Sequence, residues 1–161
     1  MKTQKAEKVL IALDYDPTAQ KVAEAGFLLA KTMKAEVILL HVMTDPFYYS
    51  STAYSPIMGF TGYADGGQLQ LESEGALKDA TSKYLDNVKK HLGDDSIMIM
   101  IKEGDFAESI IKTAKSVHAD LIVMGSHSRK WLEKIIMGSV TEKVLQLTTV
   151  PLFIVPTKKQ D

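Results

Sequence analysis

The 161-residue sequence contains no cysteine, which excludes disulfide bridges and thiolate sites. Charge of either sign is not in excess: 19 Lys and Arg face 20 Asp and Glu, so the basic footprint of a nucleic-acid-binding protein is absent. No apolar run approaches the roughly 20 residues of a membrane-spanning helix. The polar start MKTQKAEK lacks the apolar region of a signal peptide. We therefore expect a soluble cytoplasmic protein without a membrane span and without a nucleic-acid partner.

Several familiar site patterns are missing as well. There is no G-x-x-x-x-G-K-[ST] sequence, which argues against a Walker-type NTPase, and no G-x-G-x-x-G after the first apolar run, which argues against a dinucleotide-binding domain. His, Asp and Glu do not cluster at metal-ligand spacing. No serine stands in a nucleophile elbow. The sequence thus assigns no catalytic residue and no metal ligand.

What the sequence does contain is an alternation of short apolar runs with amphipathic segments. Continuous apolar runs are typical of strands buried on both faces, and they lie at Val9–Leu13, Val37–Val42, Ile97–Ile101, Leu121–Met124 and Leu152–Val155. Helical spacing predicts four helices, which follow Asp16-Pro17, span about Leu69 to Gly93, follow Asp105, and follow Gly138-Ser139. The alternation predicts one α/β domain over residues 1–161, with a parallel sheet covered on both faces.

Local signals place several element ends. Asp16 before Pro17 is typical of a helix N-cap with proline at the first helical position. Asp105 with Glu108, and Ser139 with Glu142, have the spacing of a capping box. Prolines bracket the last predicted strand, which suits the edge of a sheet.

Residues 44–68 show no regular period and predict a long flexible loop. Its part from Pro46 to Ala64 carries no charge, but it is rich in tyrosine, phenylalanine and glycine. The aromatic residues argue against simple disorder. Two interpretations of residues 46–63 stay open: a connection whose aromatic side chains cover part of the core, or a lid or partner-binding loop.

The stretch Met124–Val140, MGSHSRKWLEKIIMGSV, differs from the rest because its pattern indicates a ligand-binding site rather than core packing. A predicted strand ends at Gly125, and the pair Gly138-Ser139 opens a predicted helix. Small residues at such ends leave backbone N–H groups able to face an anion, and the helix dipole adds to the attraction. Two such turns could hold a polyphosphate. In open parallel sheets ligands bind beyond the carboxyl ends of the strands, where Asp14, Val42 and Gly104 are also expected.

The spacing Gly125-x2-Ser128-x9-Gly138-Ser139 resembles the nucleotide-binding signature of the universal stress protein family, G-x2-G-x9-G-[ST]. The resemblance extends over nearly the whole chain, through His41-Val42, Gly138–Leu145 and Val150-Pro151. It implies a Rossmann-like, doubly wound five-stranded sheet in the order 3-2-1-4-5 with four helices. It also implies ATP, alone or with Mg²⁺, bound where strands one and four diverge, and a homodimer formed through the last strand at residues 150–156.

The same resemblance implies which residues meet the nucleotide. Asp14 would face the ribose, Val42 would face adenine through its backbone, and Ser139 would contact phosphate. The full set of implied nucleotide-binding residues is Asp14, Val42, Met124, Gly125, His127, Ser128, Arg129, Gly138, Ser139 and Val140. Structural interpretations stand beside these: Asp14 as a turn residue, Val42 and His41 as core, His127 as a solvated loop residue, Ser139 as a helix cap.

Ser128 departs from the pattern, which has glycine there. If that position needs a positive φ, serine costs of order 1 kcal/mol, and if it needs only a small side chain, the hydroxyl is tolerated. We expect a dimeric, ATP-binding stress-response regulator of an unidentified protein. The alternatives are a nucleotide-free interaction dimer, and a slow ATPase or nucleotidyl-transfer enzyme on the same fold, although no evident base is placed to activate water.

Overall fold

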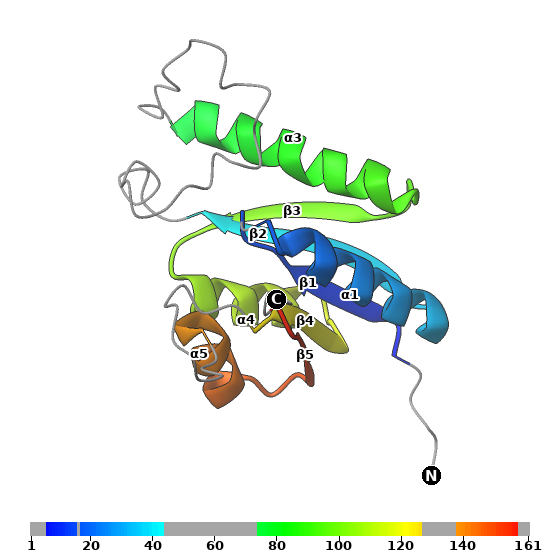
Figure 1. The fold of residues 1–161 in the computed structure, drawn as a ribbon. Coiled ribbons are helices and arrows are strands. Elements are labelled where there is room, and N and C mark those ends of the chain that lie inside the picture. The colour runs from blue at the N-terminus through cyan, green and yellow to red at the C-terminus, as the bar shows by residue number, and fades with distance from the viewer. Residues whose placement is uncertain (1–5, 16, 44–73, 127–137, 158–161) are drawn as a thin grey trace.

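The computed structural model describes residues 6–15, 17–43, 74–126 and 138–157 (Figure 1). Five parallel strands form one sheet in the order β3-β2-β1-β4-β5, which confirms the predicted fold class and strand order. The strands are β1 Lys8–Ala12, β2 Glu36–Met43, β3 Met98–Glu103, β4 Leu121–Gly125 and β5 Leu152–Val155. The helices of the described residues are α1 Ala19–Met33, α3 Glu74–Leu92, α4 Phe106–Ser116 and α5 Ser139–Leu147.

Helices cover both faces of the sheet, α1 and α3 on one side and α4 and α5 on the other (Figure 1). Successive strand residues point to opposite faces. Val9 and Ile11 therefore pack in the cluster under α1 and α3, while Leu10 packs in the cluster under α4 and α5. All three are fully buried. The continuous apolar runs of the central strands are explained by this two-sided burial.

The prediction of a third strand buried on both faces is wrong. β3 lies at one edge of the sheet, where Met98 is 55% exposed and the following residues up to Ile101 are only half-buried. Ile97, which precedes the strand, is the buried member of the predicted run. β5 forms the opposite edge, as its flanking prolines indicated.

The helix starts agree with the sequence in one case and differ in two. Asp105 caps α4, and its side chain accepts a hydrogen bond from the Glu108 N–H at 3.0 Å. α1 begins at Ala19 with Thr18 as its N-cap, later than the prediction at Pro17, and Asp16 lies outside the described residues. The start of α3 near Leu69 and the whole 44–68 loop also lie outside them.

The capping box at Ser139 is wrong. Gly138 is the N-cap of α5, so Ser139 is already the first helical residue and its hydroxyl is out of position to cap the helix. The backbone bond from Glu142 N–H to the Gly138 carbonyl at 2.9 Å fixes this phase. The N-cap of α5 is therefore a residue that has no side chain.

A glycine allows α1 to pack closely on the sheet. Gly26 is buried in α1, and a Cβ atom there would lie 2.8 Å from Ile11 Cδ1 and 3.1 Å from Val123 Cγ1. These distances are below ordinary contact, so the neighbouring strands β1 and β4 leave no room for a side chain. Glycine lowers the helix propensity at this position, but it permits the close packing of α1 on the sheet.

We expect Gly26→Ala to lower the free energy of unfolding by about 1 kcal/mol, because overpacking outweighs the gain in helix propensity. Gly75→Ala in α3 is the matched control, since no atom of the described residues lies within 4 Å of its Cβ position. There the same change should raise the free energy of unfolding by up to about 1 kcal/mol. Urea unfolding of both variants measures the difference. Equal stabilisation by the two substitutions would contradict the close approach at Gly26.

His41 of β2 is a titratable side chain that lies in the core. His41 is 2% exposed, and its Nδ1 donates to the Leu13 carbonyl at 2.7 Å. A carbonyl only accepts, so Nδ1 carries the proton and Nε2 is the bare nitrogen of a neutral ring. Nε2 is buried without a partner among the described residues. Burial lowers the pKa of His41 from 6.5 to about 4, against a smaller opposing effect of the Leu13 hydrogen bond.

This burial predicts a pH-dependent stability. The depressed folded pKa means that the unfolded chain binds more protons between pH 6.5 and 4. The contribution is therefore complete above pH 6.5 and is lost as the pH falls, by roughly 3 kcal/mol in total. His41→Asn keeps a donor near the Nδ1 position but does not titrate. Urea unfolding from pH 7 to 4 should show a steeper loss for the wild type than for this variant. Parallel profiles would exclude His41 as the source.

Candidate functional site

The carboxyl ends of the parallel strands lie together at one end of the sheet, which we call the carboxyl edge. The order of the strands reverses there between β1 and β4. Ala12 pairs with Leu40, so extending that register by two residues places Asp14 level with Val42. In the same way, the pairing of Ile11 with Val123 places Leu13 level with Gly125. The residues that follow β1, end β2 and end β4 are therefore neighbours at the point where open sheets bind ligands.

The start of α5 is fastened to the end of β4. The Gly138 N–H donates to the Ser126 carbonyl at 3.3 Å, and the Thr141 hydroxyl donates to the Gly125 carbonyl at 2.8 Å. Ser126 is itself held by β5, because its N–H donates to the Val155 carbonyl at 2.9 Å. Gly125 and Gly138, which are far apart in sequence, thus lie together at the carboxyl edge.

The two helices on this face end differently at their N-termini. In α4 the Asp105 carboxylate accepts from the first turn, so a side chain of the helix itself satisfies that end. In α5 the N-cap is Gly138, which has no side chain to cap the first turn. The first N–H groups of a helix have no intrahelical partner. Within the described residues, the end of α5 is therefore the better suited to an anion.

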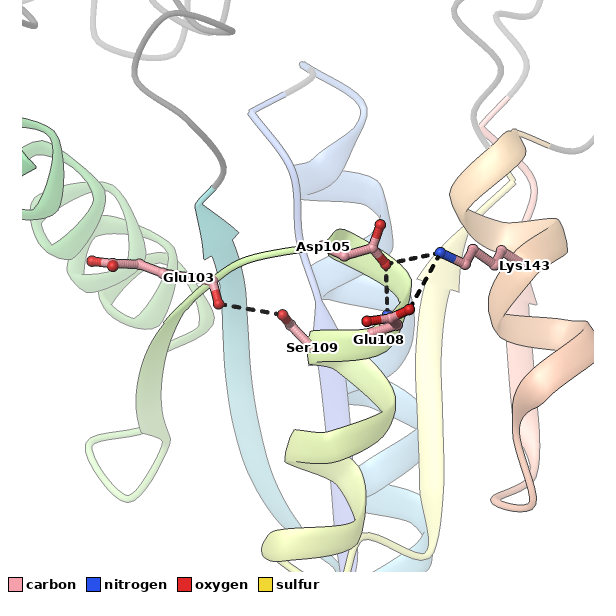
Figure 2. A network of polar contacts seen from close by, with 5 residues as sticks. All are labelled: Glu103, Asp105, Glu108, Ser109 and Lys143. Carbon is pink, nitrogen blue, oxygen red and sulfur yellow. Dashed lines mark hydrogen bonds and ion pairs between the residues drawn. The ribbon is translucent and has the colours of Figure 1, made fainter.

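A polar network joins α4 to α5 (Figure 2). The Lys143 ammonium lies 3.2 Å from an Asp105 oxygen and 3.8 Å from a Glu108 oxygen. The pKa of Asp105 is lowered, mainly by the hydrogen bond from the Glu108 N–H and then by Lys143. Across the turn from β3 to α4, the Ser109 hydroxyl donates a hydrogen bond to the Glu103 carbonyl at 3.5 Å. Lys143 is thus paired with α4 carboxylates, and the network acts as a brace between the helices.

The turn between β3 and α4 is shaped by glycine. Gly104 has a φ of +127°, which side chains rarely allow, and its N–H donates to the Met43 carbonyl at 3.0 Å. This bond carries the chain across the end of β2. Gly104 therefore serves the path of the backbone at this edge.

The predicted site residues divide by what they can offer a ligand. The side chains of Val42 and Met124 are buried in the core, and Val140 packs against the same cluster, so only their main chains are suited to contact a ligand. Asp14 is half-buried and Ser139 is exposed. Gly125 and Gly138 are half-buried at the edge. His127, Ser128 and Arg129 lie outside the described residues.

Sequence reasoning missed the side chains that hold the turn after β1. Tyr84 of α3 donates its hydroxyl to the Asp14 carbonyl at 2.9 Å, and the hydroxyls of Tyr15 and Thr81 are hydrogen-bonded to each other. In the sequence, Tyr84 stands at helical spacing with apolar residues such as Leu77 and Val88, a pattern that indicates packing only. A hydroxyl directed at a main-chain carbonyl leaves no spacing pattern, so the sequence held no signal for it.

Two features are absent from the residues that the structure describes. None of their helices has the length and apolar character to cross a membrane. No group of three or more His, Cys, Asp or Glu side chains among them is arranged to hold a metal ion. Between β1 and β4 the described edge offers main-chain groups, the Asp14 carboxylate and the Ser139 hydroxyl.

Solved structures resemble this fold over nearly its whole length. The structure of the hypothetical protein MJ0577, for which a structure-based assignment of biochemical function was made, has a TM-score of 0.70 and 28% identity, covering 98% of this chain and 100% of that one. A universal stress protein in complex with cAMP has a TM-score of 0.60 and 17% identity, covering 96% and 100%. The second likeness concerns the fold alone.

Sequence relatives agree with these structures. Universal stress protein MJ0577 of Methanocaldococcus jannaschii is 32% identical over 156 residues, covering 94% of this chain and 96% of the relative. Universal stress protein YxiE of Bacillus subtilis is 29% identical over 150 residues, covering 92% and 97%. Residues 5–156 match the model of the universal stress protein family. The chain belongs to the universal stress protein family.

Proposed function

We propose that this chain binds ATP at the carboxyl edge of its sheet, between β1 and β4, and acts as a nucleotide-dependent regulator in the cytoplasm. The observation that carries the proposal is the start of α5. Its N-cap residue, Gly138, has no side chain to cap the first turn, and the N–H of Gly138 is hydrogen-bonded to the end of β4 at the point where chain order reverses. The solved universal stress protein that contains cAMP supports a nucleotide as the class of ligand.

The charges at this edge determine the orientation of the bound nucleotide. The main-chain N–H groups of Ser139 and Val140, at the positive end of the α5 dipole, would receive the phosphates. The Asp14 carboxylate, an acceptor only, would receive the ribose hydroxyls and repel the phosphates. Val42 would contact adenine through its main chain. Met124 and Gly125 would shape the floor of the site, and His127, Ser128 and Arg129 would complete it around the phosphates, with or without Mg²⁺.

ATP should raise the melting temperature of the wild type. At 100 times Kd the stabilisation is roughly 2.7 kcal/mol, which for this size is a shift of roughly 5–10 °C. Gly138→Val should remove the shift, because a branched side chain would occupy the phosphate position. The φ of Gly138 is −57°, so the backbone accepts the change without strain. Gly75→Val is the matched control and should keep the shift, since its Cβ position is open.

Calorimetry with millimolar ATP and Mg²⁺ tests the same proposal independently. Absence of both heat and melting shift in the wild type would refute nucleotide binding, and the interaction dimer would then lead. Ser128→Gly distinguishes the two accounts of that residue: affinity rises if serine is strained and falls if its hydroxyl contacts phosphate. Phosphate release above background would favour the ATPase alternative.

We further propose that two copies associate through the free edge of β5. Among the described residues the exposed large apolar side chains are Leu28, Met98, Leu145, Leu147 and Phe153. The last three lie on β5 or on α5, the helix that precedes it along the chain. Phe153 is 42% exposed on a strand whose outer hydrogen-bonding edge has no partner strand in the described sheet. An unpaired apolar edge of this kind favours association with another chain.

Phe153→Lys should convert the dimer to a monomer, because a charge would be buried in the shared edge. Leu28→Lys is the matched control, since Leu28 is 70% exposed on α1, and it should leave the dimer intact. Light scattering after size exclusion gives the mass of each variant. A monomeric wild type at micromolar concentration would refute this association, as would equal dissociation of both variants.

A further inference from the structure

Each of the three residues that follow β1 is held by a side chain from another element. The Leu13 carbonyl accepts from His41 of β2 at 2.7 Å, and the Asp14 carbonyl accepts from Tyr84 of α3 at 2.9 Å. Tyr15 reaches α3 through its own hydroxyl, which is hydrogen-bonded to Thr81. The turn is therefore held by side chains of β2 and α3, although β1 itself ends at Ala12.

The direction of these bonds follows from the number of hydrogens. The Thr81 hydroxyl has one hydrogen and donates it to the Leu77 carbonyl at 2.9 Å. Thr81 therefore accepts from the Tyr15 phenol. The ring of Tyr15 packs between its neighbours, with its centroid 4.2 Å from that of His41 and 5.3 Å from that of Tyr84. These rings keep α3 and the turn at a fixed separation.

Tyr84 and Tyr15 have different effects on Asp14. The Tyr15 hydroxyl anchors the tip of its own side chain to α3, whereas the Tyr84 hydroxyl holds the main-chain carbonyl of Asp14. A fixed carbonyl restricts the ψ angle of that residue and hence the direction in which its carboxylate points. Binding groups must be held within about 0.5 Å of the productive position, so this restriction bears directly on a ribose contact.

We propose that Tyr84 is a positioning residue, which sets the Asp14 carboxylate in place to accept the ribose hydroxyls of a bound nucleotide. The inference rests on the proposed function, since it requires a nucleotide at this edge. It adds a role for α3, a helix that contributes none of the implied contacts. Tyr84 touches no ligand and acts only through the main chain of Asp14.

The test compares ATP with 2′,3′-dideoxy-ATP, which lacks the hydroxyls that Asp14 would bind. Calorimetry gives the affinity ratio of the two ligands for the wild type and for Asp14→Ala, Tyr84→Phe and Tyr15→Phe. We expect the wild type to prefer ATP about tenfold, which corresponds to about 1.4 kcal/mol. Asp14→Ala should abolish the preference and Tyr84→Phe should remove most of it. Tyr15→Phe, which loses the same atom in the same cluster, should keep the preference within about twofold.

The outcomes separate this inference from the proposed function. A wild type that binds neither ligand overturns both. A wild type that prefers ATP, with the preference lost in Asp14→Ala but complete in Tyr84→Phe, leaves nucleotide binding intact and overturns the positioning role. Equal loss in Tyr84→Phe and Tyr15→Phe overturns it too, because the effect would then be a general loosening of the cluster. The ratio does not respond to a change in overall stability, since both ligands bind the same folded protein.

Discussion

The rest of this structure depends on one constraint: the backbone polar groups that follow the end of β1 must be hydrogen-bonded. Within the sheet, neighbouring strands satisfy the backbone of β1, and the Leu13 N–H still finds the Leu40 carbonyl at 2.9 Å. β1 ends at Ala12, and buried backbone polar groups beyond the strand must find other partners. His41 and Tyr84 supply the donors. Because one lies on β2 and the other on α3, the turn, the sheet and the helix form one unit.

On the opposite face of the sheet, the N-termini of α4 and α5 are capped differently. Asp105 satisfies the first turn of α4 and, with Glu108, holds Lys143 of α5 (Figure 2). Gly138 supplies no acceptor to the first turn of α5. The same network that caps α4 thus braces α5, whose N-cap residue has no side chain. Exposed ion pairs contribute little to stability, so the value of the brace lies in orientation.

The fold could be predicted because the central strands are buried on both faces, which produces continuous apolar runs that few other structures share. The same rule failed at β3, since a run of apolar residues reads alike whether a helix covers its second face or solvent does. A different rule, the capping-box spacing, failed at Ser139. Ser139 and Glu142 have the required spacing, but the helix begins one residue earlier than that spacing predicts, with Gly138 as its N-cap. The ligand contacts came from family resemblance, and the Tyr84 bond to a main-chain carbonyl had no counterpart in the sequence.

The two halves of the proposed site are held from opposite faces of the sheet. Asp14 is fixed from the side of α3, and Gly138 is fixed by the end of β4 on the side of α4 and α5. Each half is attached to buried strands, so their separation is set before any ligand arrives. A ligand that joins them needs hydroxyl donors at one end and an anion at the other. Burial keeps His41 neutral near pH 7, because its pKa is lowered to about 4. No positive charge from that ring therefore opposes the polarity that Asp14 and the α5 dipole impose.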